Sequence, residues 1–296
     1  MNNPLVSILI PVYNREDIVG ETIESALAQT YSNIEIVIVD NCSTDGTWTV
    51  LQDYAKKDKR IRVFQNEENV GPVLNWKRCI DEAKGEYAKI LFSDDLISEN
   101  FIEETVKLID VDTAFVLSKI TTFEPSKQTV NSRYSKKESY TSDEYLKDIL
   151  FNKKLQFPVS PSCALIRTKD MKKSLLVDIP NELNLDFSIY GAGNDLLIFL
   201  LVAKKYKKIA IVSNATSFFR YHSGSFSASN NLIMYYDYSK YYFIKNFMPS
   251  NLSKFKSDLF LKMLRAKKKD PIYKLIKTRL NGCYLIKGIL NKVYRV

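Results

Sequence analysis

The sequence lacks any hydrophobic run long enough to cross a membrane as a helix. Its longest uninterrupted apolar stretch is the eight residues of Leu196–Ala203, whereas a membrane-spanning helix needs about 20 residues. The first residues, Met-Asn-Asn-Pro, lead straight into a strand-like segment without the pattern of a signal peptide. We therefore expect a protein that does not cross a bilayer as a single helix.

Cysteine and histidine are also scarce. The chain of 296 residues has four cysteines and one histidine, His222. The cysteines are scattered and lack the paired spacing of a metal-binding motif, which is typical of reduced thiols in a cytoplasmic protein. No cysteine-based metal site is therefore indicated.

Two common nucleotide-binding motifs are missing. No strand-like segment is followed by G-x-G-x-x-G, since Gly191-Ala192-Gly193 lacks the third glycine and precedes a late helix. The motif G-x-x-x-x-G-K-[ST] is absent as well. Both absences disfavour a dinucleotide-dependent oxidoreductase and a P-loop enzyme.

Positive charge is present, but it is unevenly distributed. The formal net charge is +9, with +11 in residues 251–296 and −2 in the remainder. Because apolar residues interrupt the basic ones, the tail fits a solvated helical appendage, a nucleic-acid contact or an anionic membrane surface. Nucleic acid is the least favoured, since no recognised nucleic-acid-binding fold accompanies the charge.

The first hundred residues alternate between strand and helix patterns. Strands are expected at 6–10, 34–39, 61–65 and 87–92, and helices at 18–29, 47–57 and 73–84. This alternation predicts a parallel sheet with right-handed crossovers, which binds ligands at the carboxyl ends of its strands. The second half is less regular, with strands expected at 114–120 and 210–212 and helices at 143–151 and 195–205.

Polar clusters follow three of the predicted strands, at Pro11–Asn14, Asp40–Gly46 and Ser93–Asp95. We expect them to converge at one edge of the sheet. Asp40 can accept a hydrogen bond from a nucleobase or a ribose, or it can cap the next helix together with Asp45. The adjacent carboxylates Asp94 and Asp95 suit Mn²⁺ or Mg²⁺, although an acidic doublet can also be a solvated turn.

Several segments together resemble glycosyltransferase family 2, which has the GT-A fold. The matching segments lie within residues 5–100, in the order and spacing of the family: 6–14, 25–31, 35–40, 69–71, 83–87 and 92–95. The resemblance implies an α/β protein with a Rossmann-like, mostly parallel central sheet, flanking helices and a helical C-terminal appendage. It also implies a catalytic domain at 1–228, with a nucleotide-binding half at 1–100 and an acceptor-binding half at 101–228, followed by a basic aromatic region at 229–296.

The resemblance further implies roles for residues of the first half. Pro11, Tyr13 and Asp40 would line the base pocket, Asp94 would face the ribose, and Asp95 would bind the metal that bridges the donor pyrophosphate. Many members carry a carboxylate at the position of Ser93, so this chain has one fewer there.

Two clusters of the second half complete the implied site. Asn194-Asp195 resembles a Glu-Asp pair whose aspartate is the catalytic base, although Asp195 can also be an acid placed at a helix start. The segment Phe219–Ser225 resembles the end of the family's catalytic domain. There Arg220 could pair with phosphate or a carboxylate, and His222 could be a metal ligand, a diphosphate donor or a structural histidine.

The expected activity is an inverting, metal-dependent hexosyl or N-acetylhexosaminyl transfer at the inner face of the cell membrane. The donor would be a nucleotide-sugar, with UDP-sugar expected first and dTDP- or GDP-sugar still open, and the acceptor a lipid-linked glycan of a surface polysaccharide such as O-antigen or capsule. Two alternatives stay open: a nucleotidyltransferase, and a binding module that keeps the nucleotide pocket without catalysis.

Overall fold

One mixed sheet organises the protein. The computed structural model describes residues 3–266, apart from 125–128, 134–136, 153–154, 156 and 222–231. Within them the strand order is β3-β2-β1-β4-β9-β6-β10-β5, with β7 on β6 and β8 on β10. The strands are β1 (Val6–Val12), β2 (Ile34–Asp40), β3 (Ile61–Gln65), β4 (Tyr87–Ile90), β5 (Leu96–Ile97), β6 (Thr113–Glu124), β7 (Thr129–Arg133), β8 (Ser139–Thr141), β9 (Ala164–Arg167) and β10 (Lys208–Arg220).

The strands of the first hundred residues run parallel, as their alternation with helices predicts. β3, β2, β1 and β4 pair in parallel, and β6 and β10 form a second parallel pair. β9 lies antiparallel between β4 and β6 and joins the two sets into one sheet. The α/β fold with a Rossmann-like central sheet is thereby confirmed.

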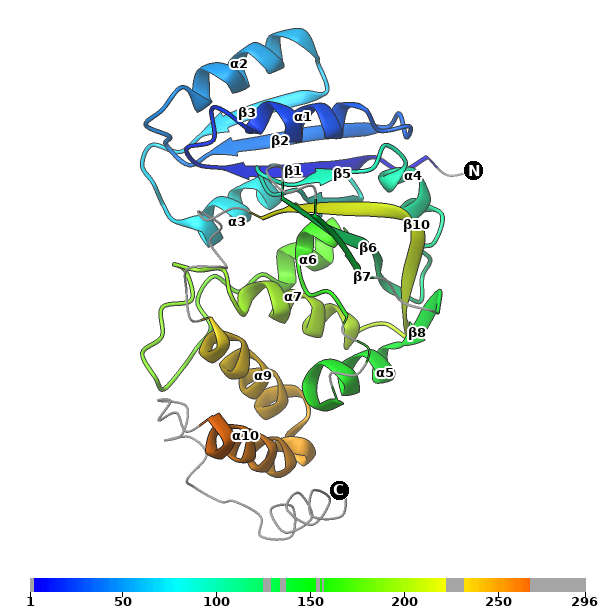
Figure 1. Ribbon diagram of the computed structural model, residues 1–296, viewed down its shortest axis with the longest axis vertical. Coiled ribbons are helices and arrows are strands. Elements are labelled where there is room, and N and C mark those ends of the chain that lie inside the picture. The colour runs from blue at the N-terminus through cyan, green and yellow to red at the C-terminus, as the bar shows by residue number, and fades with distance from the viewer. Residues whose placement is uncertain are drawn as a thin grey trace.

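Helices cover both faces of the sheet (Figure 1). α1, α2 and α4 pack on one face, while α3, α5, α6 and α7 pack on the other. α9 lies against α7, and α10 lies against α9. The helices are α1 (Val19–Leu27), α2 (Thr47–Lys57), α3 (Pro72–Glu82), α4 (Phe101–Val106), α5 (Ser142–Lys147), α6 (Thr168–Ser174), α7 (Asn194–Ala203), α9 (Ile233–Phe247) and α10 (Leu252–Ala266), with short turns η1 (Asp148–Asn152), η2 (Pro161–Cys163) and η3 (Pro249–Asn251).

The apolar run at 196–203 is a core helix. In α7 its side chains are almost all fully buried, because the sheet lies on one side and α9 on the other. Phe199, for example, meets Phe115 of β6 edge-to-face, with ring centroids 4.9 Å apart. None of the helices in the described part of the chain is long and apolar enough to span a membrane.

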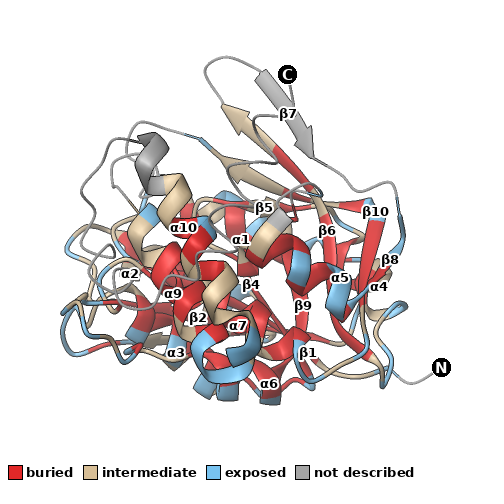
Figure 2. Cartoon of the chain, turned by 90° about the horizontal axis from the view of Figure 1, so that it is seen from below, coloured by how far each residue is buried: buried red, intermediate tan, exposed pale blue. Residues whose placement is uncertain are grey.

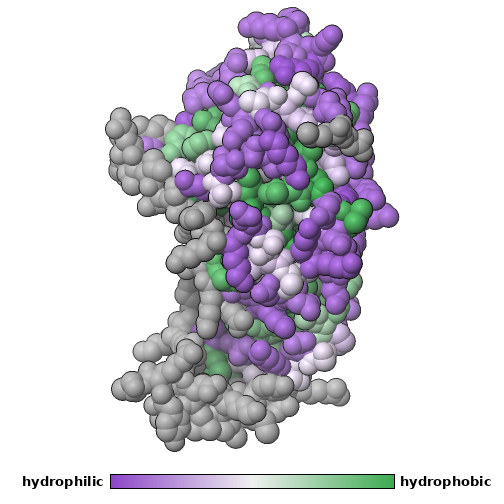
Figure 3. All heavy atoms as spheres, turned by 90° about the vertical axis from the view of Figure 1, so that its right-hand side faces the viewer, coloured by the Kyte–Doolittle hydropathy of each residue, from purple (hydrophilic) through white to green (hydrophobic). Residues whose placement is uncertain are grey.

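Burial is concentrated in the sheet, whose central strands are largely buried in Figure 2. β1 and β2 are buried along their whole length, which explains why both read as continuous apolar runs. On the face seen in Figure 3, apolar patches are broken up by polar side chains. The sheet therefore provides a rigid base, and the segments that follow its strands carry the polar chemistry.

β1 runs two residues beyond the end predicted from Pro11. Pro11 pairs in register with Val39 of β2 and is buried. β4 pairs with β1 only up to Leu9, and the main-chain carbonyl of Val12 faces β2, where it accepts from Asn41. The missing N–H of Pro11 therefore lies on the side where β4 has already ended, so no ladder hydrogen bond is lost.

Other local predictions need correction. For the helix expected at 18–29, the sequence offers Asn14 or Asp17 as a cap. α1 begins after Ile18 without a side-chain cap, and Asn14 accepts instead from the main chain of Thr44. The helix expected at 143–151 is α5, which ends at Lys147 and continues as the short π-helix η1. The short strands β5 and β9 and the helices α4 and α6 had no clear sequence pattern, because each is only two to seven residues long.

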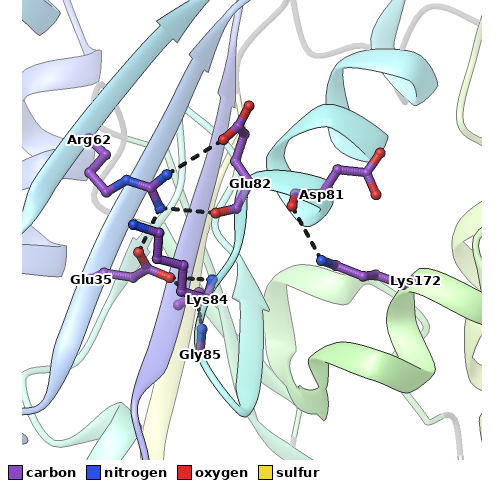
Figure 4. A network of polar contacts seen from close by, with 8 residues as sticks. Glu35, Arg62, Asp81, Glu82, Lys84, Gly85 and Lys172 are labelled. Carbon is purple, nitrogen blue, oxygen red and sulfur yellow. Dashed lines mark hydrogen bonds and ion pairs between the residues drawn. The ribbon is translucent and has the colours of Figure 1, made fainter.

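A polar network closes the amino-terminal end of the parallel strands (Figure 4). The buried carboxylate of Glu35, at the start of β2, accepts from the Ser7 hydroxyl at 2.6 Å, the Lys84 amide at 2.6 Å and Arg62 at 2.9 Å. Arg62 also donates to the main-chain carbonyl of Glu82 at 2.9 Å. This network joins three strands to the end of α3, at the edge opposite the predicted site.

Candidate active site

The polar clusters that follow the parallel strands share one edge of the sheet, as predicted. β1, β2 and β4 are neighbours and run in the same direction, and Val12 lies opposite Asp40. Pro11 is buried beside this edge, and Tyr13 extends beyond it with 39% of its surface exposed. The expected base-pocket residues therefore occur together, although their nucleotide contacts stay a prediction.

Asp40 anchors the loop that follows β2. It is fully buried, accepts from the Ser43 amide and hydroxyl, and accepts from the exposed Gln65 amide of β3 at 2.9 Å. Asp45, by contrast, accepts from the amide of Thr47, the first residue of α2, at 3.0 Å. The N-cap of α2 is Gly46, so neither aspartate is the cap itself. Asp45 binds the first helical amide from the preceding position, and Asp40 holds the loop.

Asp95 is the buried member of the acidic doublet. Its carboxylate accepts from the Ser162 hydroxyl at 3.1 Å and from the Arg220 amide at 3.2 Å. Burial, together with the neighbouring Asp94, raises the pKa of Asp95 to about 7, and these two hydrogen bonds only partly oppose that shift. The ionised carboxylate is thus short of positive charge, which is the condition that a bound cation would relieve.

Arg220 connects the doublet to α1. Its side chain donates to the main-chain carbonyl of Asp94 at 3.0 Å and to the carboxylate of Glu21 at 2.6 Å. Of the two partners proposed for Arg220, the structure shows a carboxylate. His222 lies outside the described residues, so its role as a metal ligand stays a prediction.

Lys89 is a buried cation near the doublet that the sequence reasoning did not single out. It is fully buried in β4, donates to the main-chain carbonyl of Ser162, and lies 4.1 Å from the ring centre of Phe101. Burial lowers the pKa of Lys89 to about 7, while Asp95 acts in the opposite direction. The sequence feature that could have identified Lys89 is its position as the single charged residue in an otherwise apolar strand.

Asp195 opens α7 and has a well-defined set of donors. One oxygen, Oδ1, accepts from the amides of Gly193 at 2.8 Å and Leu196 at 2.6 Å, and the other, Oδ2, accepts from the Tyr236 hydroxyl at 2.8 Å. Burial raises the pKa of Asp195 to about 6 even though these donors lower it. The group is therefore mostly ionised at neutral pH and can take up a proton. The sequence did not identify Tyr236, because it is one of several tyrosines in an aromatic segment.

One turn of α3 connects these groups. Asn75 donates to the main-chain carbonyls of Val39 at 3.1 Å and Val12 at 3.5 Å, next to Asp40. The ring of the adjacent Trp76 lies 5.3 Å from that of Phe92, which precedes the acidic doublet. Trp76 also contacts Gly191, where a Cβ atom would come within 2.2 Å of the indole. Asn75 and Trp76 therefore link the segments that carry Asp40, Asp94, Asp95 and Asp195.

Asn194 does not share this chemistry. Its side-chain amide donates to the main-chain carbonyls of Leu176 at 2.7 Å and Val177 at 3.1 Å, in the segment that follows α6. Asn194 therefore holds the start of α7 in place. The asparagine that stands here in place of the glutamate of the resembling pair therefore makes structural hydrogen bonds in this chain.

The donor set suits a hard divalent cation only in part. Asp94 and Asp95 offer the carboxylate oxygens that Mg²⁺ and Mn²⁺ prefer, and the raised pKa of Asp95 is what added positive charge would lower. Among the described residues, however, no group of three or more His, Cys, Asp or Glu side chains could hold a metal. Phosphate oxygens, water or residues outside the described part would have to complete the coordination.

Comparison with solved structures supports the fold. The crystal structure of S. aureus TarS 1–349 in complex with UDP-GlcNAc aligns over 97% of this chain and 80% of that one, with a TM-score of 0.64 and 19% identity. TarS 1–349 in complex with UDP aligns with a TM-score of 0.62 and 20% identity, over 93% of this chain and 75% of that one. TarS 1–349 thus shares the fold of this chain.

Sequence comparison adds named relatives. The putative teichuronic acid biosynthesis glycosyltransferase TuaG of Bacillus subtilis (strain 168) is 34% identical over 148 residues, which are 50% of this chain and 59% of TuaG. Glycosyltransferase GlyG of Streptococcus pneumoniae serotype 4 is 40% identical over 99 residues, 33% of each chain. The chain thus matches less than two thirds of the length of these relatives.

The family profile described as glycosyl transferase family 2 matches residues 7–175, from β1 through α6. This range includes the three strand ends, Asn75, Trp76 and the acidic doublet. Because the match extends over more than half of the sequence, this chain belongs to glycosyltransferase family 2.

Proposed function

We propose that this chain transfers a hexosyl or N-acetylhexosaminyl group, with inversion, from a nucleotide-sugar to an acceptor hydroxyl. UDP-sugar is the expected donor, which the UDP-GlcNAc bound to the TarS neighbour supports. The expected acceptor is a lipid-linked glycan of a surface polysaccharide, supported by teichuronic acid biosynthesis in the name of TuaG.

The observation that carries the proposal is the link through α3. Asn75 is bonded to the strand ends beside Asp40, while Trp76 contacts both Phe92 and Gly191. A donor held between Asp40 and the acidic doublet would therefore have Asp195 as the nearby carboxylate of the second half. An inverting transfer needs this arrangement, with a base on the acceptor side and positive charge at the leaving diphosphate.

Each acidic residue of the site has its own role in the proposed transfer. Asp40 would accept a base N–H in place of the exposed Gln65 amide, and Asp94 would accept from the ribose. Asp95 would hold Mn²⁺ or Mg²⁺ with the partly exposed Asp94 beside it. Members of this family typically use a divalent metal, which when bound would neutralise the departing diphosphate. Asp195 would take the acceptor proton.

Thermal-shift measurements with UDP, GDP and dTDP, each with Mn²⁺ and with EDTA, test donor binding. We expect UDP with Mn²⁺ to raise the melting temperature most. In the Asp95→Ala variant, the additional increase that depends on Mn²⁺ should be lost. Stabilisation by UDP that is equal in EDTA and in Mn²⁺ would argue against the metal role of Asp95. No response to any nucleotide would argue against the whole proposal.

Turnover separates the alternatives. Slow hydrolysis of UDP-GlcNAc to UDP and free sugar is expected of a glycosyltransferase that lacks its acceptor. A nucleotidyltransferase would instead cleave the bond between the two phosphates of UDP-GlcNAc. Its products would be UTP and GlcNAc-1-phosphate when pyrophosphate is added, or UMP and GlcNAc-1-phosphate when water is the only acceptor. A binding module would bind UDP and leave every nucleotide-sugar intact over long incubation.

The basic tail supports a second, independent part of the proposal, association with an anionic membrane surface. Residues 267–296 contain nine Lys or Arg and one Asp, and each basic residue near such a surface contributes about 1 kcal/mol. A truncation should end after Ala266, because Phe255 and Leu259 of α10 are buried against the core. We expect the truncated protein to lose binding to phosphatidylglycerol vesicles. Unchanged binding would refute membrane association through residues 267–296.

A further inference from the structure

The Tyr236 hydroxyl provides a hydrogen bond to the proposed base from outside the family match. Tyr236 lies in the first turn of α9, well beyond the segment 7–175 that the family profile covers. Its hydroxyl donates to Oδ2 of Asp195 at 2.8 Å. The residue that orients this carboxylate therefore comes from the C-terminal helical region.

The hydrogen bonds of Asp195 indicate which oxygen can act. Each carboxylate oxygen has about two acceptor positions. Oδ1 uses both, for the amides of Gly193 and Leu196, whereas Oδ2 uses one, for Tyr236, among the described residues. The remaining position on Oδ2 is therefore the one that can receive a proton from an acceptor hydroxyl.

α9 is also packed directly against the loop that leads to Asp195. Gly193 has a φ of +89°, and a Cβ atom there would lie 2.3 Å from the Ser239 hydroxyl and 2.9 Å from the Tyr235 carbonyl. The ring of Phe187 meets that of Tyr235 edge-to-face at 5.2 Å. The contact between Tyr236 and Asp195 thus belongs to a close-packed junction, which limits how far either group can shift.

We propose that Tyr236 is a positioning residue for the reaction, which holds Oδ2 of Asp195 with one acceptor position directed to the incoming hydroxyl. This inference rests on the proposed function, in which Asp195 is the base. It makes α9 part of the active site, although α9 lies outside the matched family segment.

The same hydrogen bond sets the pH at which the base becomes active. The titratable side chains that sense the charge of Asp195 are Tyr236 of α9 and Tyr145 of α5, and burial raises the pKa of both phenols, with Asp195 adding to the effect. Both phenols stay protonated while Asp195 titrates. Since the Tyr236 hydroxyl lowers the pKa of Asp195, its removal should raise that pKa.

The test compares wild type, Tyr236→Phe and the control Tyr242→Phe, which removes a hydroxyl farther along the same helix. Carbon-13 NMR of labelled aspartate side chains gives the pKa of Asp195, whose signal is identified by its loss in Asp195→Asn. Hydrolysis of UDP-GlcNAc from pH 5 to 9 gives kcat and KM. The NMR measurement needs no turnover.

For Tyr236→Phe we expect the pKa of Asp195 and the acid limb of the rate profile to rise by about one pH unit. We also expect kcat to fall about tenfold, with KM for UDP-GlcNAc within about twofold of wild type. Tyr242→Phe should match wild type throughout.

An unchanged Asp195 pKa in Tyr236→Phe would overturn the inference, and so would a shifted pKa with wild-type kcat and acid limb. If wild type hydrolyses or transfers no nucleotide-sugar, the proposed function fails and the catalytic role of Tyr236 fails with it. If wild type turns over UDP-GlcNAc and Tyr236→Phe has the same Asp195 pKa, kcat and acid limb as wild type, this inference fails and the proposed function stands.

Discussion

Two buried carboxylates at opposite ends of the parallel strands experience opposite electrostatic environments. At the amino-terminal edge, burial alone would raise the pKa of Glu35, but hydrogen bonds from Ser7, the Lys84 amide and Arg62 outweigh it, and the pKa is lowered (Figure 4). At the carboxyl edge, burial and Asp94 outweigh the donors to Asp95, and its pKa rises to about 7. Both residues are 7% exposed, although Asp95 is the more deeply buried, and their pKa values shift in opposite directions.

The difference shows how this fold separates stability from function. Glu35 has its opposite charge within the protein, in Arg62 at 2.9 Å. Asp95 shares its surroundings with a second carboxylate and with Lys89, whose own pKa is lowered to about 7 by burial. A carboxylate that the protein leaves short of compensation is a typical functional group, because a ligand can supply the missing charge.

The largest expected effect lies at the site. Asp195→Asn keeps the shape of the side chain but removes the proton acceptor, so turnover of UDP-GlcNAc should fall about a thousandfold. The affinity for UDP should stay within about twofold of wild type by calorimetry. Asp112→Asn is the control, since Asp112 pairs with Lys207, which follows the other end of α7. Near-normal turnover of Asp195→Asn would remove it as the base.

The second effect concerns stability at the opposite edge. Glu35→Gln keeps the hydrogen bonds from Ser7 and Lys84 possible but leaves Arg62 without its buried partner, so the free energy of unfolding should fall by about 3 kcal/mol. The exposed pair of Asp53 and Lys56 is the contrast, and Asp53→Asn should cost less than about 0.5 kcal/mol. Urea unfolding at pH 7 measures both. Equal losses would contradict the role given to burial.

The smallest expected effect is an increase in the free energy of unfolding, produced by a substitution of Asp95. Because the pKa of Asp95 is raised in the folded state, its contribution to stability is present below pH 4 and is lost as pH rises towards 7. Asp95→Asn should therefore raise the free energy of unfolding by about 1 kcal/mol at pH 8 in EDTA, with no difference at pH 4. A destabilised Asp95→Asn at pH 8 would show that the protein already compensates this charge.

Much of the first half could be predicted from the sequence, because its elements are long and strongly periodic. α2 spans 47–57 and β3 spans 61–65, as their patterns indicate. The prediction that β1 ends before Pro11 was wrong. Whether a proline ends a strand depends on where the neighbouring strand stops, because its missing N–H matters only opposite a paired strand. β9 is four buried residues placed antiparallel between distant strands, which no local pattern reveals.

The site was predictable to the extent that it consists of strand ends and known motifs. Asp40, Asp94, Asp95 and Asp195 were identified in this way, and their roles stay predictions. Their hydrogen-bond partners Ser162 and Tyr236 were not identified. These lie 67 and 41 residues away from the carboxylates they contact, and serine and tyrosine carry no signal of their own in a sequence.

The sequence by itself determined the family, the α/β fold and the order of the acidic residues along the chain, because periodicity and short motifs are local properties. Only the tertiary structure decided that Glu35 has an arginine partner whereas Asp95, among the described residues, has neutral donors at hydrogen-bond distance. It also decided that Asn75 and Trp76 connect the two halves of the site, and that α9 reaches Asp195. The physical reason is that burial and electrostatic compensation depend on groups that folding brings together from distant parts of the chain.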